Sequence, residues 1–179
     1  PFGVNFSGSP TLVKKGTIAT VNTNWSFTND DVSPVEKQMI KLGSGAAEEV
    51  AVGTKTKQFT GIAATTTIVL TITAAGRNYS KSITVTFNNP AYYGAVAASV
   101  TSMTETSIKA LTEHLNSGKG YTINSINLAN QKLCYAYPAA FGALTSIKDA
   151  NNFDYLASYT RSEVQVNGEN YYVYLLTNA

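Results

Sequence analysis

The stretch "TTTIVLTITAAGRNYSKSITVTF", residues 65–87, decides the fold of the first part of the chain. Large aliphatic side chains occupy every second position from Ile68 to Ile72, the period of two that is typical of a strand with one buried face. After a turn, in which we expect Gly76 and Asn78 to take positive φ, the alternation resumes. The pattern therefore predicts a long antiparallel hairpin.

Segments upstream of this hairpin show the same strand pattern. In "ATVNTNWSFT", residues 19–28, Trp25 shares a face with apolar neighbours, so we expect its indole to pack in the core rather than to stack on a ligand. Residues 35–42 and 55–62 are further strand candidates. Roughly six or seven short strands separated by regular turn signals predict an immunoglobulin-like β-sandwich over residues 1–90. A small up-and-down or Greek-key barrel is the structural alternative.

The segment "FNNPAYYGAV", residues 87–96, marks the end of this first domain. Pro90 has no N–H for a strand ladder and biases the residue before it toward extended geometry. We therefore predict a domain boundary there, with a small α+β assembly or attachment domain over residues 91–179.

The hydrophobic period changes after this boundary. Residues 102–118 place apolar side chains on one stripe, with Ser102 and Glu105 in capping-box spacing and Gly118 positioned to end a helix. The pattern predicts one amphipathic helix that covers an antiparallel sheet.

That sheet is predicted from two downstream segments. "KLCYAY", residues 132–137, is one strand, and Asn167-Gly168 is the strongest hairpin turn signal in the chain. Counting residue pairs across a two-residue turn assigns the side chains of the two strands to the two faces of the hairpin. One face carries Val164, Tyr171 and Val173, and the other carries Arg161, Glu163, Tyr172 and Tyr174. Arg161 is then opposite Tyr174, within reach of a cation–π contact.

Tyrosine is the residue type that points to an interaction surface, because ten of the eleven tyrosines follow residue 90. Tyrosine offers large, rigid contact area with a polar tip, which suits protein interfaces and glycan stacking. We take Arg161, Tyr172 and Tyr174 as the candidate interface or glycan-stacking residues. Tyrosines that only bridge sheet and solvent are the structural alternative.

The sequence carries no recognisable catalytic or metal site. His114 is the single histidine, and no nucleophile lies in a recognisable setting. Cys134, the single cysteine, lies in an apolar strand-like run and is expected to be a buried small hydrophobe. "DANNFD", residues 149–154, lacks the glycine and glutamate of a calcium loop and is interpreted as a turn capped by its own side chains. We expect no enzyme activity and no cofactor; two carboxylates in a hydrolase cleft are a remaining alternative.

The composition of the chain bears on which classes of partner it can bind. Hydrophobic residues make up 44% and charged residues 13% of the chain, so it should fold, and a formal charge of +2 does not favour nucleic acid. No apolar stretch reaches the ~20 residues of a membrane span, so we expect no membrane insertion. The first residue is proline rather than methionine, so we expect a processed form or part of a longer protein.

The order of these parts resembles a known family. An early "NWSF" strand, "FTGI", the hairpin of residues 65–87, the junction "NNPAYYGA", a helix, "YAYPAAFGALTSIKDANNFDY" and a terminal "YYVYLLT" together resemble the Ig-like domain structural proteins of tailed bacteriophages. The resemblance implies a non-enzymatic tail, baseplate or fibre component. It also implies relatives that run somewhat further past the last tyrosine-rich strand.

Function follows from this resemblance as an expectation. It implies a virion protein, assembled in the host cytoplasm, that forms homo-oligomers, contacts other virion proteins and contacts a bacterial surface glycan. The alternative is a carbohydrate-binding or adhesin module of a bacterial surface protein, located at the cell surface.

Overall fold

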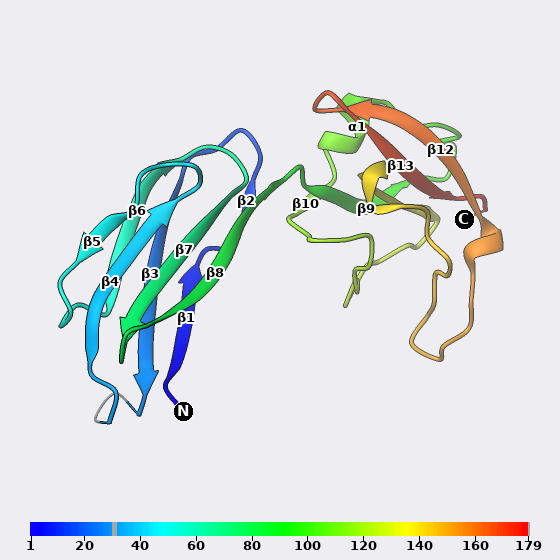
Figure 1. Ribbon diagram of the computed structural model, residues 1–179. Helices are drawn as coiled ribbons and strands as arrows, with labels where there is room; N and C mark the ends of the chain where they lie inside the picture. Colours follow the sequence, from blue (N-terminus) through cyan, green and yellow to red (C-terminus); the bar gives the residue numbers. More distant parts are fainter. Residues whose placement is uncertain (30–31, 179) are drawn as a thin grey trace. The chain divides into compact units, whose positions relative to one another are not determined.

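A computed structural model describes residues 1–29 and 32–178 of the chain. It is 54% strand and 6% helix, which confirms the predicted mainly β class with a small helical part. The chain divides into two compact units, Pro1–Phe87 and Asn88–Ala179, which we call the N-terminal and C-terminal units. Each is described separately (Figure 1).

The N-terminal unit consists of two antiparallel sheets. One has the strand order β1-β3-β6 and the other the order β2-β8-β7-β4-β5. The bounds are β1 Gly3–Ser9, β2 Leu12–Lys14, β3 Ala19–Thr28, β4 Val35–Leu42, β5 Glu48–Val50, β6 Thr56–Ile62, β7 Thr66–Ala74 and β8 Arg77–Asn88. The segment 35–42 therefore pairs with β7 and β5 and not with the tryptophan-bearing strand β3.

One hydrophobic core fills the space between these sheets. Side chains from both sheets enter it, among them Val21, Trp25, Ile40, Ile68, Leu70, Ile72 and Val85. The alternate burial of β7 that the sequence predicted is confirmed, because Ile68 and Ile72 have no exposed surface. Trp25 is only 4% exposed, so its predicted role as a core residue is confirmed as well.

The β7–β8 hairpin is confirmed, with one correction at its turn. Ala74 pairs with Arg77, so the turn has two residues, Ala75 and Gly76, both with positive φ. Asn78, expected in the turn, lies inside β8. A two-residue hairpin of this type needs positive φ at both central positions, and here alanine fills one of them.

The C-terminal unit is built on one five-stranded antiparallel sheet of order β10-β9-β11-β13-β12. Its strands are β9 Ala91–Ala97, β10 Thr112–His114, β11 Gln131–Pro138, β12 Tyr159–Val166 and β13 Glu169–Leu176, with helix α1 Glu105–Lys109 and 3-10 turns η1 Ala139–Phe141 and η2 Leu156–Ser158. The predicted strand at 132–137 and the β12–β13 hairpin are confirmed. Val164 pairs with Tyr171, as counted across the Asn167-Gly168 turn.

The two faces of this sheet have different covers. One face packs against α1 through a cluster that includes Met103, Ile108, Cys134, Tyr171 and Val173. The other face carries Tyr135, Tyr137, Tyr172 and Tyr174, and it packs against the segment that runs from η1 to η2. The predicted division of the β13 side chains between two faces is therefore confirmed.

The helix is much shorter than the predicted 102–118 segment. It begins after the N-cap Thr104 and not after Ser102, and the capping box pairs Thr104 with Ser107. Ser107 Oγ accepts a hydrogen bond of 2.8 Å from the Thr104 N–H. The prediction that Ser102 and Glu105 cap the helix is wrong.

The second half of the predicted helix is a strand. Thr112–His114 pairs antiparallel with Ala91–Tyr93 of β9. The backbone groups of these residues therefore bond to a distant strand and not within a helix. Gly94 lies against Leu111, where an added Cβ would be 3.0 Å from a leucine methyl carbon. Tertiary pairing has overridden the local helical pattern here.

Candidate functional site

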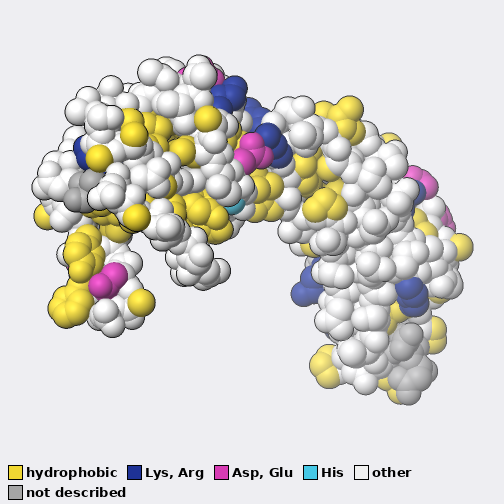
Figure 2. Space-filling model, turned by 180° about the vertical axis from the view of Figure 1, so that it is seen from behind, with side chains coloured by type: hydrophobic (Ala, Val, Ile, Leu, Met, Phe, Trp, Pro, Cys, Tyr) yellow, Lys and Arg dark blue, Asp and Glu magenta, His cyan; other side chains and the backbone are white. Residues whose placement is uncertain are grey.

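A projecting loop of the C-terminal unit presents two of the three exposed aromatic side chains among the described residues. Residues 147–156, which we call the aromatic loop, lie between η1 and β12 (Figure 1, orange). Phe153 is 66% exposed and Tyr155 is 45% exposed. In the space-filling view, hydrophobic side chains lie at the end of this loop (Figure 2). Exposed aromatic rings on a projecting loop provide apolar area that a partner can bury.

The conformation of the aromatic loop is fixed by its two aspartates. Asp149 Oδ1 accepts hydrogen bonds from the backbone N–H groups of Asn151 and Phe153, at 2.9 and 3.0 Å. The backbone of Asp149 donates to the Phe153 carbonyl at 3.1 Å. The predicted turn with side-chain caps is therefore confirmed.

Asp154 closes the base of the loop. Its Oδ1 atom accepts from the N–H groups of Leu156 and Ile147, at 2.9 and 3.0 Å. These two backbone hydrogen bonds lower the pKa of Asp154, because they favour the charged carboxylate. Both aspartate side chains thus accept hydrogen bonds from backbone N–H groups of their own loop. Among the described residues, no group of three or more His, Cys, Asp or Glu side chains is placed to hold a metal ion.

The tyrosines beneath the loop act as a scaffold. Tyr174 Oη accepts a hydrogen bond of 2.8 Å from the Leu144 N–H, and Tyr137 Oη donates to the Gly142 carbonyl at 2.9 Å. Burial raises the pKa of both Tyr135 and Tyr137, to about 12 for Tyr135. Their hydroxyls therefore stay protonated: that of Tyr137 holds the covering segment on the sheet, and that of Tyr135 donates to the Lys119 carbonyl at 3.0 Å.

Tyr174 cannot serve as the predicted stacking residue. It is only 3% exposed, because the segment after η1 covers its ring and donates the Leu144 N–H to its hydroxyl. The sequence placed it correctly on the tyrosine-bearing face but did not reveal that this face is covered there. Tyr174 is a structural anchor.

Arg161 and Tyr172 do lie together. The guanidinium carbon of Arg161 is 4.8 Å from the centroid of the Tyr172 ring. Arg161 is opposite Tyr174 in the strand register, as predicted, but its side chain crosses diagonally to Tyr172 instead. Such a contact between an exposed cation and a half-buried ring contributes about 0.5–1 kcal/mol.

His114 lies in an aromatic stack at the other end of the sheet. Its ring stacks on Tyr121 at a centroid distance of 3.7 Å and also faces Tyr135. Its Nε2 atom is buried and has no hydrogen-bond partner among the described residues. Desolvation lowers the pKa of His114, because burial disfavours the charged imidazolium. His114 is thus half-buried in an aromatic setting.

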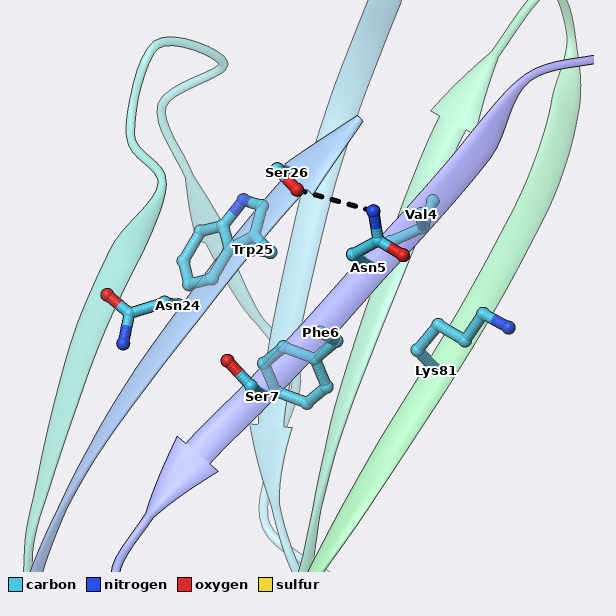
Figure 3. A pocket seen from close by; sticks show the side chains of 8 residues that line it. All are labelled: Val4, Asn5, Phe6, Ser7, Asn24, Trp25, Ser26 and Lys81. Atoms are coloured by element: carbon cyan, nitrogen blue, oxygen red, sulfur yellow. Dashed lines mark hydrogen bonds between the residues drawn. The ribbon is translucent and has the colours of Figure 1, made fainter. Parts of the chain in front are cut away.

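A groove of about 420 Å³ lies along β1 in the N-terminal unit (Figure 3). Its lining residues are Val4, Asn5, Phe6, Ser7, Asn24, Trp25, Ser26 and Lys81. Lys81 is the one charged member of this set, so the groove contains no carboxylate pair for acid–base chemistry. Trp25 bonds inward to Gln38, so its ring serves the core rather than a ligand.

The aromatic loop is the feature that sequence reasoning missed. The segment was interpreted as a turn, and composition alone does not distinguish the exposed Phe153 from the partly buried Phe141. The asparagines and aspartates around Phe153 could have indicated its exposure, because a short turn built from polar residues has few apolar side chains against which a ring can be buried.

Together the fold and this surface define a two-unit, β-rich protein with an exposed aromatic loop whose backbone is hydrogen-bonded to its own aspartates. No protein-family model and no curated protein matches the chain. In the described residues, no helix is both long enough and apolar enough to cross a membrane.

Proposed function

We propose that this chain is a non-enzymatic structural protein of a bacteriophage virion, in a tail, baseplate or fibre. It acts through protein–protein contacts and attaches to the host surface. The observation that carries the proposal is the aromatic loop, in which Phe153 and Tyr155 are exposed on a backbone fixed by Asp149 and Asp154. A preordered loop loses little conformational entropy on binding, which favours its use as a contact.

The strand order of the N-terminal unit supports the immunoglobulin-like assignment within this proposal. A three-stranded sheet β1-β3-β6 together with a sheet that contains the consecutive strands β8-β7-β4 is similar to the division of strands in such sandwiches. Sandwiches of this kind commonly present loops or faces to partners without chemistry of their own. The resemblance to phage Ig-like proteins supplies the virion setting.

The proposal is tested on particles of a tailed phage whose genome encodes this sequence. We expect peptides of the chain in mass spectra of density-purified virions, at a fixed ratio to the other structural proteins. Finding the chain only in the lysate, and not in purified particles, would overturn the proposal.

The loop is tested separately with the variant Phe153→Ser/Tyr155→Ser. Because both rings are exposed, we expect a folded chain that is incorporated poorly or attaches poorly to host cells. Ile18→Ser is the matched control, since Ile18 is 75% exposed but lies in the N-terminal unit. Equal attachment by all three chains would remove the loop from the proposal.

A carbohydrate-binding or adhesin module is the second candidate. The Arg161–Tyr172 pair favours it, because an aromatic ring beside a cation can stack on a sugar and pair with its acidic group. It predicts glycan-array binding that falls on Tyr172→Ala. An array without signal for the wild-type chain would reject it.

A further inference from the structure

The strand β12 is a long open edge. It is the last strand of the five-stranded sheet and pairs only with β13. Residues 160–163 are all exposed. In an antiparallel ladder, every second residue directs its N–H and C=O away from the paired strand, so an edge strand carries unpaired backbone groups. The opposite edge of this sheet, β10, has only three residues.

β12 lacks most features that usually protect such an edge. Its sequence, "YTRSEVQV", contains no proline, glycine or lysine. Its register with β13 runs through eight consecutive pairs without a bulge. A regular edge of this kind is available to pair with another strand.

The charges on β12 are complementary to themselves under a two-fold axis. Arg161 and Glu163 flank Ser162 and lie on the same face, because residues two apart in a strand share a face. If two copies of β12 pair antiparallel with Ser162 opposite Ser162, Arg161 of each copy lies opposite Glu163 of the other. Opposite charges at facing positions stabilise a strand pair, and like charges destabilise it.

The same charges disfavour the two nearest alternative registers, in which the axis moves by one residue along β12 and each side chain stays on the same face of the sheet. Centring the axis on Arg161 would place two arginines opposite each other, and centring it on Glu163 would place two glutamates opposite each other. The charge pattern therefore selects one register, as the self-complementary patch of a two-fold interface requires.

Both charged side chains are already held in place by β13. The Arg161 guanidinium lies over the Tyr172 ring at 4.8 Å, and Glu163 Oε2 accepts a hydrogen bond of 2.7 Å from Asn170 Nδ2. Within the part of the chain that the structure describes, neither forms an ion pair. Both charges remain available to a second copy, with part of their side-chain ordering already complete.

We propose that β12 pairs antiparallel with β12 of a second copy about a two-fold axis at Ser162. The pairing joins two five-stranded sheets into one continuous sheet, with two reciprocal Arg161–Glu163 ion pairs on the same face. This inference deepens the proposed function, because it names a second copy of the chain as an assembly partner. The pairing itself is argued from β12 alone, and only its role in virion assembly rests on the proposed function.

The test is the mass of the full chain in solution, measured by sedimentation equilibrium over a wide concentration range. We expect wild type to approach twice 19.1 kDa. Arg161→Glu and Glu163→Arg should each weaken dimerisation by about tenfold or more, because both facing pairs become repulsive. The combined exchange, Arg161→Glu with Glu163→Arg, should restore the dimer.

The control is the same exchange at an exposed ion pair of the N-terminal unit. Lys37 Nζ lies 3.3 Å from Glu49 Oε2, and exchanging these two residues should leave the mass unchanged. A monomeric wild type, or folded single variants whose dimer is not restored by the exchange, would overturn the inference. The virion experiment is independent: a dimer that is absent from particles would reject the proposed function and leave this interface standing.

Discussion

The indole nitrogen of Trp25 donates a hydrogen bond of 2.6 Å to Oε1 of Gln38 in the core of the N-terminal unit. Trp25 lies on β3 and Gln38 on β4, so the bond joins the two sheets. The amide of Gln38 donates in turn to the carbonyls of Ala51 and Thr54, at 2.7 and 3.1 Å. The fully buried Gln38 thus provides a partner for the Trp25 N–H and the Thr54 carbonyl, and a second donor for the Ala51 carbonyl, which also accepts from the Thr54 N–H at 2.8 Å.

Gln38→Leu should destabilise the N-terminal unit by about 2–4 kcal/mol, because it removes the hydrogen-bond partner of the buried Trp25 N–H and of the Thr54 carbonyl. Chemical unfolding followed by the fluorescence of Trp25, the single tryptophan, measures the loss. Gln58→Leu is the control, since its exposed side chain bonds only to Asn22 and should cost little. Equal effects of the two variants would contradict the proposed role of Gln38.

His114 should titrate below its ordinary pKa of 6.5, because burial among tyrosine rings disfavours the imidazolium. Its ring protons give a single set of resonances, since the chain has one histidine, and a titration by nuclear magnetic resonance reports the pKa directly. A pKa at or above 6.5 would contradict the desolvated setting.

The same shift makes the stability of the C-terminal unit depend on pH. Its unfolded state takes up the His114 proton as the pH falls through 6.5, while the folded state resists it, so stability should decrease below that pH. His114→Phe should reduce this decrease between pH 7.5 and 5.5. Thermal unfolding followed by tyrosine circular dichroism provides the comparison, and an unchanged pH profile in the variant would assign the effect elsewhere.

Asp149→Ala should loosen the aromatic loop without unfolding the sheet. The variant removes the acceptor for the Asn151 and Phe153 amides, so these amides should exchange hydrogen several-fold faster. Asn151→Ala is the matched loop variant, because it keeps both of these backbone bonds to Asp149. Identical exchange rates in the two variants would show that Asp149 does not order the loop.

Cys134 should be unreactive in the native chain. Burial raises the pKa of its thiol to about 12, so almost no thiolate forms near neutral pH, and the sulfur has no exposed surface. Modification by a disulfide reagent should therefore require opening of the C-terminal unit and accelerate with denaturant. Rapid labelling of the native chain at neutral pH would contradict this burial.

The sequence by itself determined the hairpins of both units. The alternation around Ile68 predicted the strands and the buried face of the first hairpin, and the Asn167-Gly168 turn predicted the faces and the register of the second, because both signals depend only on neighbouring residues. The burial of Trp25 and Cys134 followed from the same local patterns.

Only the tertiary structure decided the features that depend on distant segments. Residues 112–114 carry a helical pattern but pair with β9, because a neighbouring strand satisfies their backbone groups. Tyr174 is buried because the segment around Leu144 covers it, while Phe153, in the same connection, stays exposed. Contacts between residues far apart in sequence set which aromatic rings are core and which are surface, and periodicity along the chain does not encode them.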